Sequence, residues 1–377
     1  MSTDALTLVT AFLEDHPPTT TDDRALREAR FDAGLAFPHF SVGAGGLGLP
    51  PGAAAIVERA FARAGAEDWS DRNVIGLGMA APSLHAFGSD EQRALLRPLF
   101  TGDYIWCQLF SEPDAGSDLA GVRTTAVRDG DTWIVDGQKV WTTLAHVARW
   151  GLLLARTDPD APRHRGLTYF LLDMTLPGVE VRPLRQITGE AEFNEVYMTG
   201  VRVPDSARLG PEGEGWRVAL TTLMNERVAL PDVSSTPGSG PIARAVETYR
   251  DAAQRGAAGP AQRDRLMELW VRSEVVRLTG LRAQEMAQRA TPGPEGSIGK
   301  VAMAETNKAI FELIMDLLGP QAMLIDHYEP VRPALASVHG GADARKAFLR
   351  TRANSIEGGT SEILRNVIAE RVLGLPK

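Results

Sequence analysis

The sequence contains very little cysteine: Cys107 is the only one in 377 residues. One thiol excludes an internal disulfide and a thiolate metal cluster, and we expect Cys107 to be a small buried side chain. The histidines are few, and none stands at the spacing of a metal-ligand pair. No G-x-S-x-G nucleophile elbow occurs. We therefore expect no metal site and no serine-hydrolase site.

Long apolar runs are also missing. No stretch approaches the roughly 20 residues that a transmembrane helix needs, and the N-terminus, Met1-Ser2-Thr3-Asp4, lacks the basic segment of a secretory signal. Basic residues are fewer than acidic ones, so the formal net charge is −8. That balance argues against a nucleic acid or an acidic membrane as partner. We expect a soluble protein and take the cytoplasm as its location.

What the chain does have is a dense motif-bearing stretch at residues 105–143. Within it, Ser111–Asp118 reads as a polar turn, since Pro113 and Gly116 prevent a continuous helix or strand. Further on, Asp136-Gly137 lies between two alternating apolar runs, a pattern that predicts a tight hairpin. On residue types alone, the turn hydroxyls could be local caps and Trp141 a packing residue, so this pattern leaves the function open.

The periodicity of the sequence predicts three regions. Residues 1–104 read as helices, with one helix expected from Asp22 through Arg30. Residues 105–209 hold short apolar runs separated by turn residues, which predicts a small β-barrel or sandwich. Residues 210–377 return to long amphipathic helices, typical of a bundle. The fold class is therefore predicted to be α+β and multidomain, with boundaries after residues 104 and 209.

A glycine-rich segment at residues 43–48, GAGGLG, matches the G-x-G-x-x-G pattern of a dinucleotide-binding turn. Such a turn must open a helix that faces the pyrophosphate. Here Leu49-Pro50-Pro51 follows at once. We interpret the segment as a surface loop and not as a cofactor site.

Three motifs resemble a known family. They are FSEPDAGSDLAG at 110–121, DGQKVWTT at 136–143 and EGGTSEILRN at 357–366. In order and spacing they are similar to the acyl-CoA dehydrogenases, and the resemblance extends from about Gly43 to Pro376. It implies an N-terminal helical domain, a middle β-barrel and a C-terminal four-helix bundle. It also implies FAD as cofactor, an acyl-CoA thioester as substrate, which is oxidised to the enoyl-CoA, and an electron-transferring flavoprotein as electron acceptor.

The resemblance also implies roles for individual residues. Trp141 stacks on the flavin ring, Thr143 donates to its N5 atom and Ser111 bonds its pyrimidine edge, so that charge developing on the ring is stabilised. Ser117 lies nearer the pantetheine or phosphates of CoA. The complete expected cofactor set is Gln108, Phe110, Ser111, Ser117, Trp141, Thr143, Thr360 and Glu362. The last two stand at a helix N-terminus, which suits phosphate.

The catalytic base is the point where this sequence departs from the pattern of most of the family. Most relatives place the base in a C-terminal Tyr-Glu-Gly-Thr loop, but here Gly358 occupies that position and Glu357 is one residue away. A minority carry the base on a helix before an Arg, which matches Glu226 and Arg227. We predict Glu226 as the base, with Glu357 or no base as alternatives. The backbone N–H of Gly358 is expected to polarise the thioester carbonyl.

A second departure concerns the adenine end of FAD. Relatives use an R-x-x-F-G motif from a neighbouring subunit, whereas this chain has only Gln254-Arg255-Gly256 near that place. We expect either a homodimer or homotetramer, or a chain paired with a homologous subunit, as in steroid side-chain enzymes. A catalytically inactive scaffold subunit and a related flavin oxidase or hydroxylase remain as alternatives.

Overall fold

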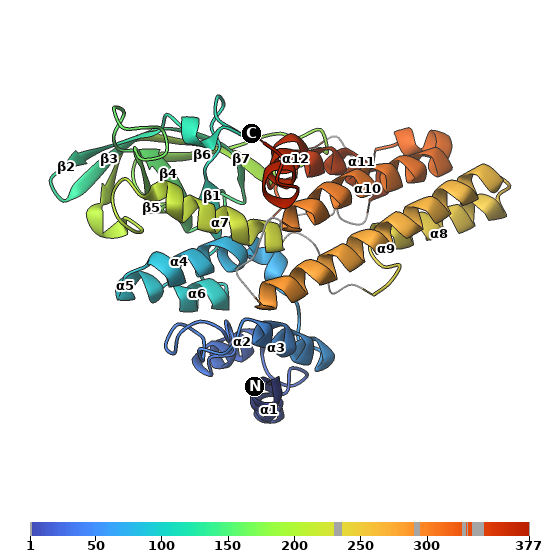
Figure 1. Ribbon diagram of the computed structural model, residues 1–377, viewed down its shortest axis with the longest axis horizontal. Coiled ribbons are helices and arrows are strands. Elements are labelled where there is room, and N and C mark those ends of the chain that lie inside the picture. The colour runs from blue at the N-terminus through green and yellow to red at the C-terminus, as the bar shows by residue number, and fades with distance from the viewer. Residues whose placement is uncertain are drawn as a thin grey trace. The chain divides into compact units, whose positions relative to one another are not determined.

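The computed structural model describes residues 2–229, 236–289, 295–325, 329, 331–333 and 343–376 (Figure 1). The chain divides into two compact units. The first holds Met1–Leu184, Ala191–Asn225 and Arg332–Ala336, and the second holds Arg185–Glu190, Glu226–Val331 and Ser337–Lys377. Each unit has a hydrophobic core of its own.

The N-terminal part of the first unit is helical. Its α-helices are α1 (Ser2–Asp15), α2 (Asp23–Asp32), α3 (Gly52–Arg63), α4 (Ala81–Phe87), α5 (Asp90–Arg93) and α6 (Leu96–Thr101). The carboxylate of Asp22 accepts the backbone N–H groups of Arg24 and Ala25 and so caps α2. Ser89 and Gln92 form a reciprocal capping box at α5. The helix start predicted at Asp22 is confirmed.

The glycine-rich segment at 43–48 is a loop packed on its own chain. A Cβ atom at Gly46 would lie 2.3 Å from the carbonyl oxygen of Phe40, and one at Gly45 would lie 2.5 Å from the ring of Phe31. The next helix, α3, begins only at Gly52. The glycines therefore let the loop approach buried phenylalanines, and the predicted loop is confirmed.

One sheet of seven strands follows. The strands are β1 (Trp106–Leu109), β2 (Thr125–Asp129), β3 (Thr132–Thr143), β4 (Trp150–Arg156), β5 (Leu167–Asp173), β6 (Val179–Pro183) and β7 (Phe193–Pro204). They pair in the order β1-β4-β2-β3-β7-β6, with β5 also on β4. Within the described strands β1 and β6 end this path, so the pairing is that of an open sheet.

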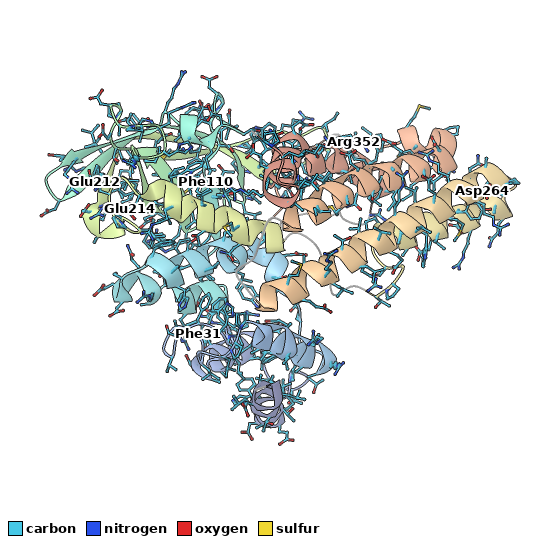
Figure 2. All side chains as sticks on the ribbon, viewed as in Figure 1. Phe31, Phe110, Glu212, Glu214, Asp264 and Arg352 are labelled. Atoms are coloured by element: carbon cyan, nitrogen blue, oxygen red, sulfur yellow. The ribbon has the colours of Figure 1, made fainter. Side chains whose placement is uncertain are left out.

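The sheet buries apolar side chains on both faces. One face holds Cys107, Trp133, Phe170 and Val196 in its core. The other face packs Trp106, Phe110 and Tyr169 against α4, α6 and the first part of α7 (Gly215–Ala229). Figure 2 shows Phe110 on the sheet side of α7. Burial on both faces explains why β4 and β5 are almost continuously apolar.

The hairpin predicted at Asp136-Gly137 is wrong. β3 runs straight through these residues, and the register with β7 shifts between Val135 and Gly137, which marks a β-bulge. The true hairpin joins β2 to β3, where Asp129 pairs with Thr132 and Gly130 has φ 61°. Gly137 is required for another reason, since a Cβ atom there would lie 2.4 Å from Oγ1 of Thr124.

The second unit is helical. Its helices are α8 (Pro241–Gln254), α9 (Pro260–Arg289), α10 (Glu295–Leu318), α11 (Ala344–Arg350) and α12 (Ser361–Val367), followed by a π-helical turn at Ile368–Val372. α10 packs against α8, α9, α11 and α12. The amphipathic pattern predicted for α10 is confirmed, because Ile310, Leu313, Ile314 and Leu317 are buried.

The element order of helices, sheet and helices gives an α+β multidomain fold. The finer predictions, a barrel and a four-helix bundle with boundaries after residues 104 and 209, stay predictions. None of the helices in the described ranges is long and apolar enough to cross a membrane. Cys107 is fully buried as expected, and burial raises the pKa of its thiol.

Candidate functional site

The first two motifs lie side by side in the first unit. The backbone N–H of Val140, in β3, donates to the carbonyl oxygen of Ser111 at 2.9 Å. The turn itself is tight, because Glu112 and Ala115 exchange two backbone hydrogen bonds of 3.0 Å around Pro113. Segments separated by more than twenty residues of sequence thus form one surface, with Ser111 beside the strand that carries Trp141.

A buried ion pair joins the same two motifs. Nζ of Lys139 lies 2.8 Å from Oε1 of Glu112, and the two side chains are 0% and 7% exposed. Nζ also donates to the carbonyl oxygens of Phe110 at 3.0 Å and Leu154 at 2.8 Å. The sequence analysis missed this pair, although a lysine at an inward-facing position of an apolar strand was a signal for it.

The pair is charged near neutral pH, because each partner offsets the burial of the other. Burial lowers the pKa of Lys139 to about 8, while the Glu112 carboxylate favours the ammonium form. Burial alone would raise the pKa of Glu112, but Lys139 and the backbone N–H groups of Arg123 and Thr124 outweigh it and lower that pKa. All three ammonium protons of Lys139 have acceptors, so the turn is fixed to the strand.

Trp141 occupies a strained position at the end of β3. The pairing of β3 with β7 shifts register between Lys139 and Thr142, and Trp141 has φ 60°, a left-handed backbone that a non-glycine residue rarely adopts. Trp141 is 57% exposed, and its ring meets that of Phe193 edge to face, with ring centroids 5.9 Å apart. Strain combined with an exposed aromatic face points to a binding role and not to core packing.

Two threonines follow Trp141 directly in β3. Thr143 is half-buried and pairs in register with Phe193. Thr142 is buried, and its Oγ1 has no hydrogen-bond partner among the described residues. An open aromatic face, neighbouring hydroxyls and an orphaned buried oxygen together fit a flat, polar-edged ring. The residues present therefore fit the flavin that the motifs imply.

The remaining cofactor candidates of the first unit differ in exposure. Phe110 is buried and meets Tyr169 edge to face, with centroids 5.8 Å apart. Gln108, in β1, is half-buried, and Phe110 directly follows that strand. Ser117 is exposed on the turn, and the space beside Gly116 is open. Beside Gly121 the space is filled, because a Cβ atom there would lie 2.7 Å from the guanidinium of Arg163.

The third motif forms a glycine turn in the second unit. Gly358 has φ 62° and Gly359 has φ 94°, so both need the conformational freedom of glycine. Nζ of Lys300, a side chain of α10 that is 1% exposed, donates to the carbonyl oxygen of Gly359 at 2.7 Å. A buried ammonium group thus holds the turn in place, and the sequence analysis did not single out Lys300.

Glu357 is engaged in a structural ion pair. Its two carboxylate oxygens accept Nη1 of Arg350 at 3.0 Å and Nη2 of the same guanidinium at 2.8 Å, and Nδ2 of Asn354 donates to it at 2.8 Å. Arg350 is 7% exposed. A bidentate pair with a buried guanidinium occupies both oxygens, which disfavours Glu357 as a free base.

The start of α12 carries the last two cofactor candidates. Oγ1 of Thr360 accepts the backbone N–H of Ile363 at 3.2 Å and caps the helix. The side chain of Glu362 is 77% exposed and lies 3.5 Å from Arg365. Between them Ser361 is buried, with an Oγ that has no partner in the described part of the chain. Their contacts with FAD stay predictions.

Glu226 and Arg227 lie in the last turns of α7. Their side chains are outside the described residues, so their proposed roles rest on the sequence. Among the described residues no group of three or more His, Cys, Asp or Glu side chains is placed to hold a metal ion.

Comparisons with known proteins match the chain along most of its length. The family models described as "Acyl-CoA dehydrogenase, middle domain" and "Acyl-CoA dehydrogenase, C-terminal domain" match residues 107–201 and 213–373. Acyl-CoA dehydrogenase FadE34 of Mycobacterium tuberculosis is 41% identical over 352 residues, which cover 92% of this chain. The chain spans only 45% of the length of that relative.

A second relative and one solved structure match this chain over most of its length and over most of their own. Acyl-CoA dehydrogenase IpdE1 of Mycobacterium tuberculosis is 39% identical over 94% of this chain and 88% of its own length. The solved structure of the ChsE4–ChsE5 complex from Mycobacterium tuberculosis is 28% identical, with a TM-score of 0.73, over 100% of this chain and 96% of the matched chain.

Proposed function

The chain belongs to the acyl-CoA dehydrogenase family, and we propose that it oxidises an acyl-CoA thioester to the α,β-enoyl-CoA. Members of this family bind FAD. The observation that carries the proposal is the junction of the two motifs, which Lys139 and Glu112 lock together beside an exposed, strained Trp141. FAD, when bound, supplies the acceptor for the hydride that leaves the β-carbon.

Residues of the first unit would hold and orient the flavin. Trp141 offers its open face to the ring, and Ser111 and Thr143 offer hydroxyl groups to its edge. Gln108 and Phe110 line the same region, and Ser117, on the exposed turn, is proposed to meet the CoA portion of the substrate. Donors that are fixed before the reaction stabilise developing charge without reorganising, which is how such sites lower a barrier.

Removal of the α-proton is assigned to the Glu226 carboxylate. The ion pair of Glu357 with Arg350 supports this choice, because the guanidinium engages both carboxylate oxygens of Glu357. Arg227 is proposed to position the base. The backbone N–H of Gly358, in the turn held by Lys300, is proposed to bond the thioester carbonyl and so make the α-proton more acidic.

The electron acceptor and the assembly are also proposals. We propose an electron-transferring flavoprotein as the acceptor. The likeness to one chain of the ChsE4–ChsE5 complex, together with the missing R-x-x-F-G motif, favours an alternative in which this chain is the FAD-binding subunit of a heteromeric acyl-CoA dehydrogenase.

The test of the reaction is anaerobic bleaching of the bound flavin by a panel of acyl-CoA thioesters. We expect at least one thioester to bleach the wild-type flavin. Glu226→Gln should retain FAD yet bleach more slowly by roughly 10²–10⁴-fold. Glu357→Gln is the matched control and should bleach at close to the wild-type rate. Slow bleaching in Glu357→Gln together with normal bleaching in Glu226→Gln would move the base to Glu357.

The test of the assembly is the FAD content of the chain expressed alone. A homo-oligomeric enzyme should contain about one FAD per protomer, whereas a heteromeric subunit should be deficient until its partner is added. A purified protein that stays colourless with every candidate partner would instead support the scaffold reading.

A further inference from the structure

A chain of three buried hydroxyl groups crosses the core of the first unit. Tyr169 of β5, Thr222 of α7 and Ser83 of α4 are each 0% exposed. Oγ1 of Thr222 lies 3.0 Å from the hydroxyl oxygen of Tyr169 and 2.9 Å from Oγ of Ser83. Oγ of Ser83 in turn lies 2.8 Å from the carbonyl oxygen of Met79, in the π-helical turn Gly76–Ala80 that precedes α4. Helix α7 is thus tied both to the sheet and to α4 (Figure 1).

The number of protons gives this chain a direction. Burial raises the pKa of Tyr169, so its hydroxyl keeps its proton and donates it to Thr222. Thr222 has one proton for two neighbours, Oγ of Ser83 at 2.9 Å and the carbonyl oxygen of Val218 at 3.2 Å. Ser83 gives its own proton to the carbonyl oxygen of Met79 and so accepts from Thr222. The three shortest contacts therefore form one directed chain from Tyr169 to Met79.

Apolar side chains would fill this space without any hydroxyl group. Leu84, Val218 and Ala219 already belong to the same core, and contacts between apolar groups do not depend on direction. Hydrogen bonds, in contrast, weaken steeply when the donor and the acceptor are misaligned. A continuous buried chain therefore fixes the rotation of α7, and its position along its own axis, relative to β5 and α4. Apolar packing alone would leave both less defined.

Tyr169 connects two parts of the proposed site. Its ring meets Phe110, one of the residues proposed to line the flavin, edge to face with centroids 5.8 Å apart. Its hydroxyl group holds Thr222. Glu226, the proposed base, follows Thr222 by four residues, about one turn later in α7. One side chain thus contacts both the flavin-lining part of the first unit and the helix that carries the base.

We propose that the hydroxyl chain of Tyr169, Thr222 and Ser83 positions α7 for removal of the α-proton. This inference rests on the proposed function, because it takes Glu226 as the base. The base takes the proton while hydride leaves toward the flavin, so both groups must be held in place relative to the substrate. Backbone hydrogen bonds join each turn of a helix to the next, so a shift of α7 at Thr222 is passed on to Glu226. The three hydroxyl residues are positioning residues, since they act through the helix.

Anaerobic bleaching of the FAD-loaded protein by an acyl-CoA thioester tests this role. Thr222→Val keeps the shape of the side chain but removes its hydroxyl group. This variant should retain FAD and bleach roughly 10–10²-fold more slowly, and Thr222→Ser should recover most of the rate. Deuterium at the α-carbon of the thioester should slow Thr222→Val by a larger factor than the wild type, because proton removal becomes the slower step. Thr221→Val makes the same change at the neighbouring position, outside the hydroxyl chain, and as the control should bleach at the wild-type rate.

A double variant separates positioning from stability. Tyr169→Phe/Thr222→Val removes the donor and the acceptor together, so its thermal midpoint should lie above that of Thr222→Val, which leaves the tyrosine hydroxyl buried and unpaired. The double variant should still bleach as slowly as Thr222→Val, because the tie between β5 and α7 is missing.

Two results would overturn the positioning role while the proposed function stands. They are a wild-type bleaching rate in Tyr169→Phe/Thr222→Val, and an α-deuterium effect in Thr222→Val that equals that of the wild type. Two other results would count against the proposed function, and against this inference with it. A wild type that no thioester bleaches would refute the reaction, and normal bleaching in Glu226→Gln would refute the assignment of the base.

Discussion

Lys139 and Glu112 form an ion pair closed off from solvent, with Nζ 2.8 Å from Oε1. The pair connects the motif turn to the strand that carries Trp141, so it joins the two motif segments of the sequence. Three acceptors surround the ammonium group, and two backbone N–H groups reach the carboxylate. Removing only one of the two charged side chains would leave the other buried and unpaired, which lowers the free energy of unfolding strongly.

The first prediction concerns the stability of this pair. Lys139→Met leaves Glu112 buried without its cation and should lower the free energy of unfolding by about 3–5 kcal/mol. Adding Glu112→Gln should recover a large part of that loss, because no buried charge then remains. Urea unfolding followed by tryptophan fluorescence measures both values. Arg202→Ala, which removes an exposed ion pair with Asp129, is the control and should cost under about 1 kcal/mol.

The second prediction concerns pH. Because burial lowers the pKa of Lys139 to about 8, the unfolded chain binds one more proton than the folded chain between about pH 8 and the ordinary lysine range. The contribution of this group to stability must therefore rise with pH in that window, by up to about 1.36 kcal/mol per pH unit. Unfolding free energies of the wild type minus those of Glu112→Gln/Lys139→Met should show the rise.

The same difference should also rise with pH in the acid range. The lowered pKa of Glu112 means that its contribution is fully present above the ordinary glutamate range and is lost as the pH falls through the folded-state value. If this difference in unfolding free energy did not change with pH in either range, the pKa values of Lys139 and Glu112 would not change on folding.

The third prediction separates the binding role of Trp141 from any structural role. Trp141→Gly removes an exposed side chain and relieves a left-handed backbone, so thermal stability should be unchanged or slightly higher. Flavin retention, read from the visible absorbance after gel filtration, should fall. Leu144→Gly is the matched control. It shares the positive φ, but Leu144 is buried, so this change should destabilise the protein by about 2–4 kcal/mol.

The fourth prediction concerns Lys300 as a positioning residue. Lys300→Met removes the buried hydrogen bond to Gly359, and such a bond from a charged donor contributes about 1.5–3 kcal/mol. Turnover should fall about tenfold or more while FAD content is kept, and amide exchange across residues 357–361 should accelerate. Lys308→Met, which removes a lysine paired with Glu305 on the same helix, should change neither quantity. Slower turnover without faster exchange would show that Lys300 does not act through the turn.

The fifth prediction concerns Glu357. Glu357→Gln should lower thermal stability, because it leaves the buried guanidinium of Arg350 without its carboxylate. Turnover per folded molecule should stay within about twofold of the wild type, since the lost group holds a turn and does not move a proton. A stable Glu357→Gln variant with abolished turnover would contradict both statements.

Much of this protein follows from local sequence. Asp22 predicted the start of α2, because a carboxylate cap needs only the backbone of its own first turn. The 3.6-residue spacing predicted the buried face of α10, and the proline after the glycine-rich segment at 43–48 excluded a dinucleotide turn. The motifs were enough to indicate the family. Each of these signals is carried by residues that are close together in the sequence or by a regular spacing of apolar residues.

Only the tertiary structure decided the rest. Two Asp-Gly pairs fit a hairpin equally well, and the position of Thr124 against Gly137 and the pairing with β7 selected the one at Gly130. Glu112 and Lys139 were both present in the motifs, yet their ion pair depends on strand packing across twenty-seven residues. The exposure of Trp141 and the ion pair between Glu357 and Arg350 could not be predicted from the sequence either. Side-chain partners set by long-range packing leave no periodic trace in a sequence, whereas helix caps and amphipathic faces do.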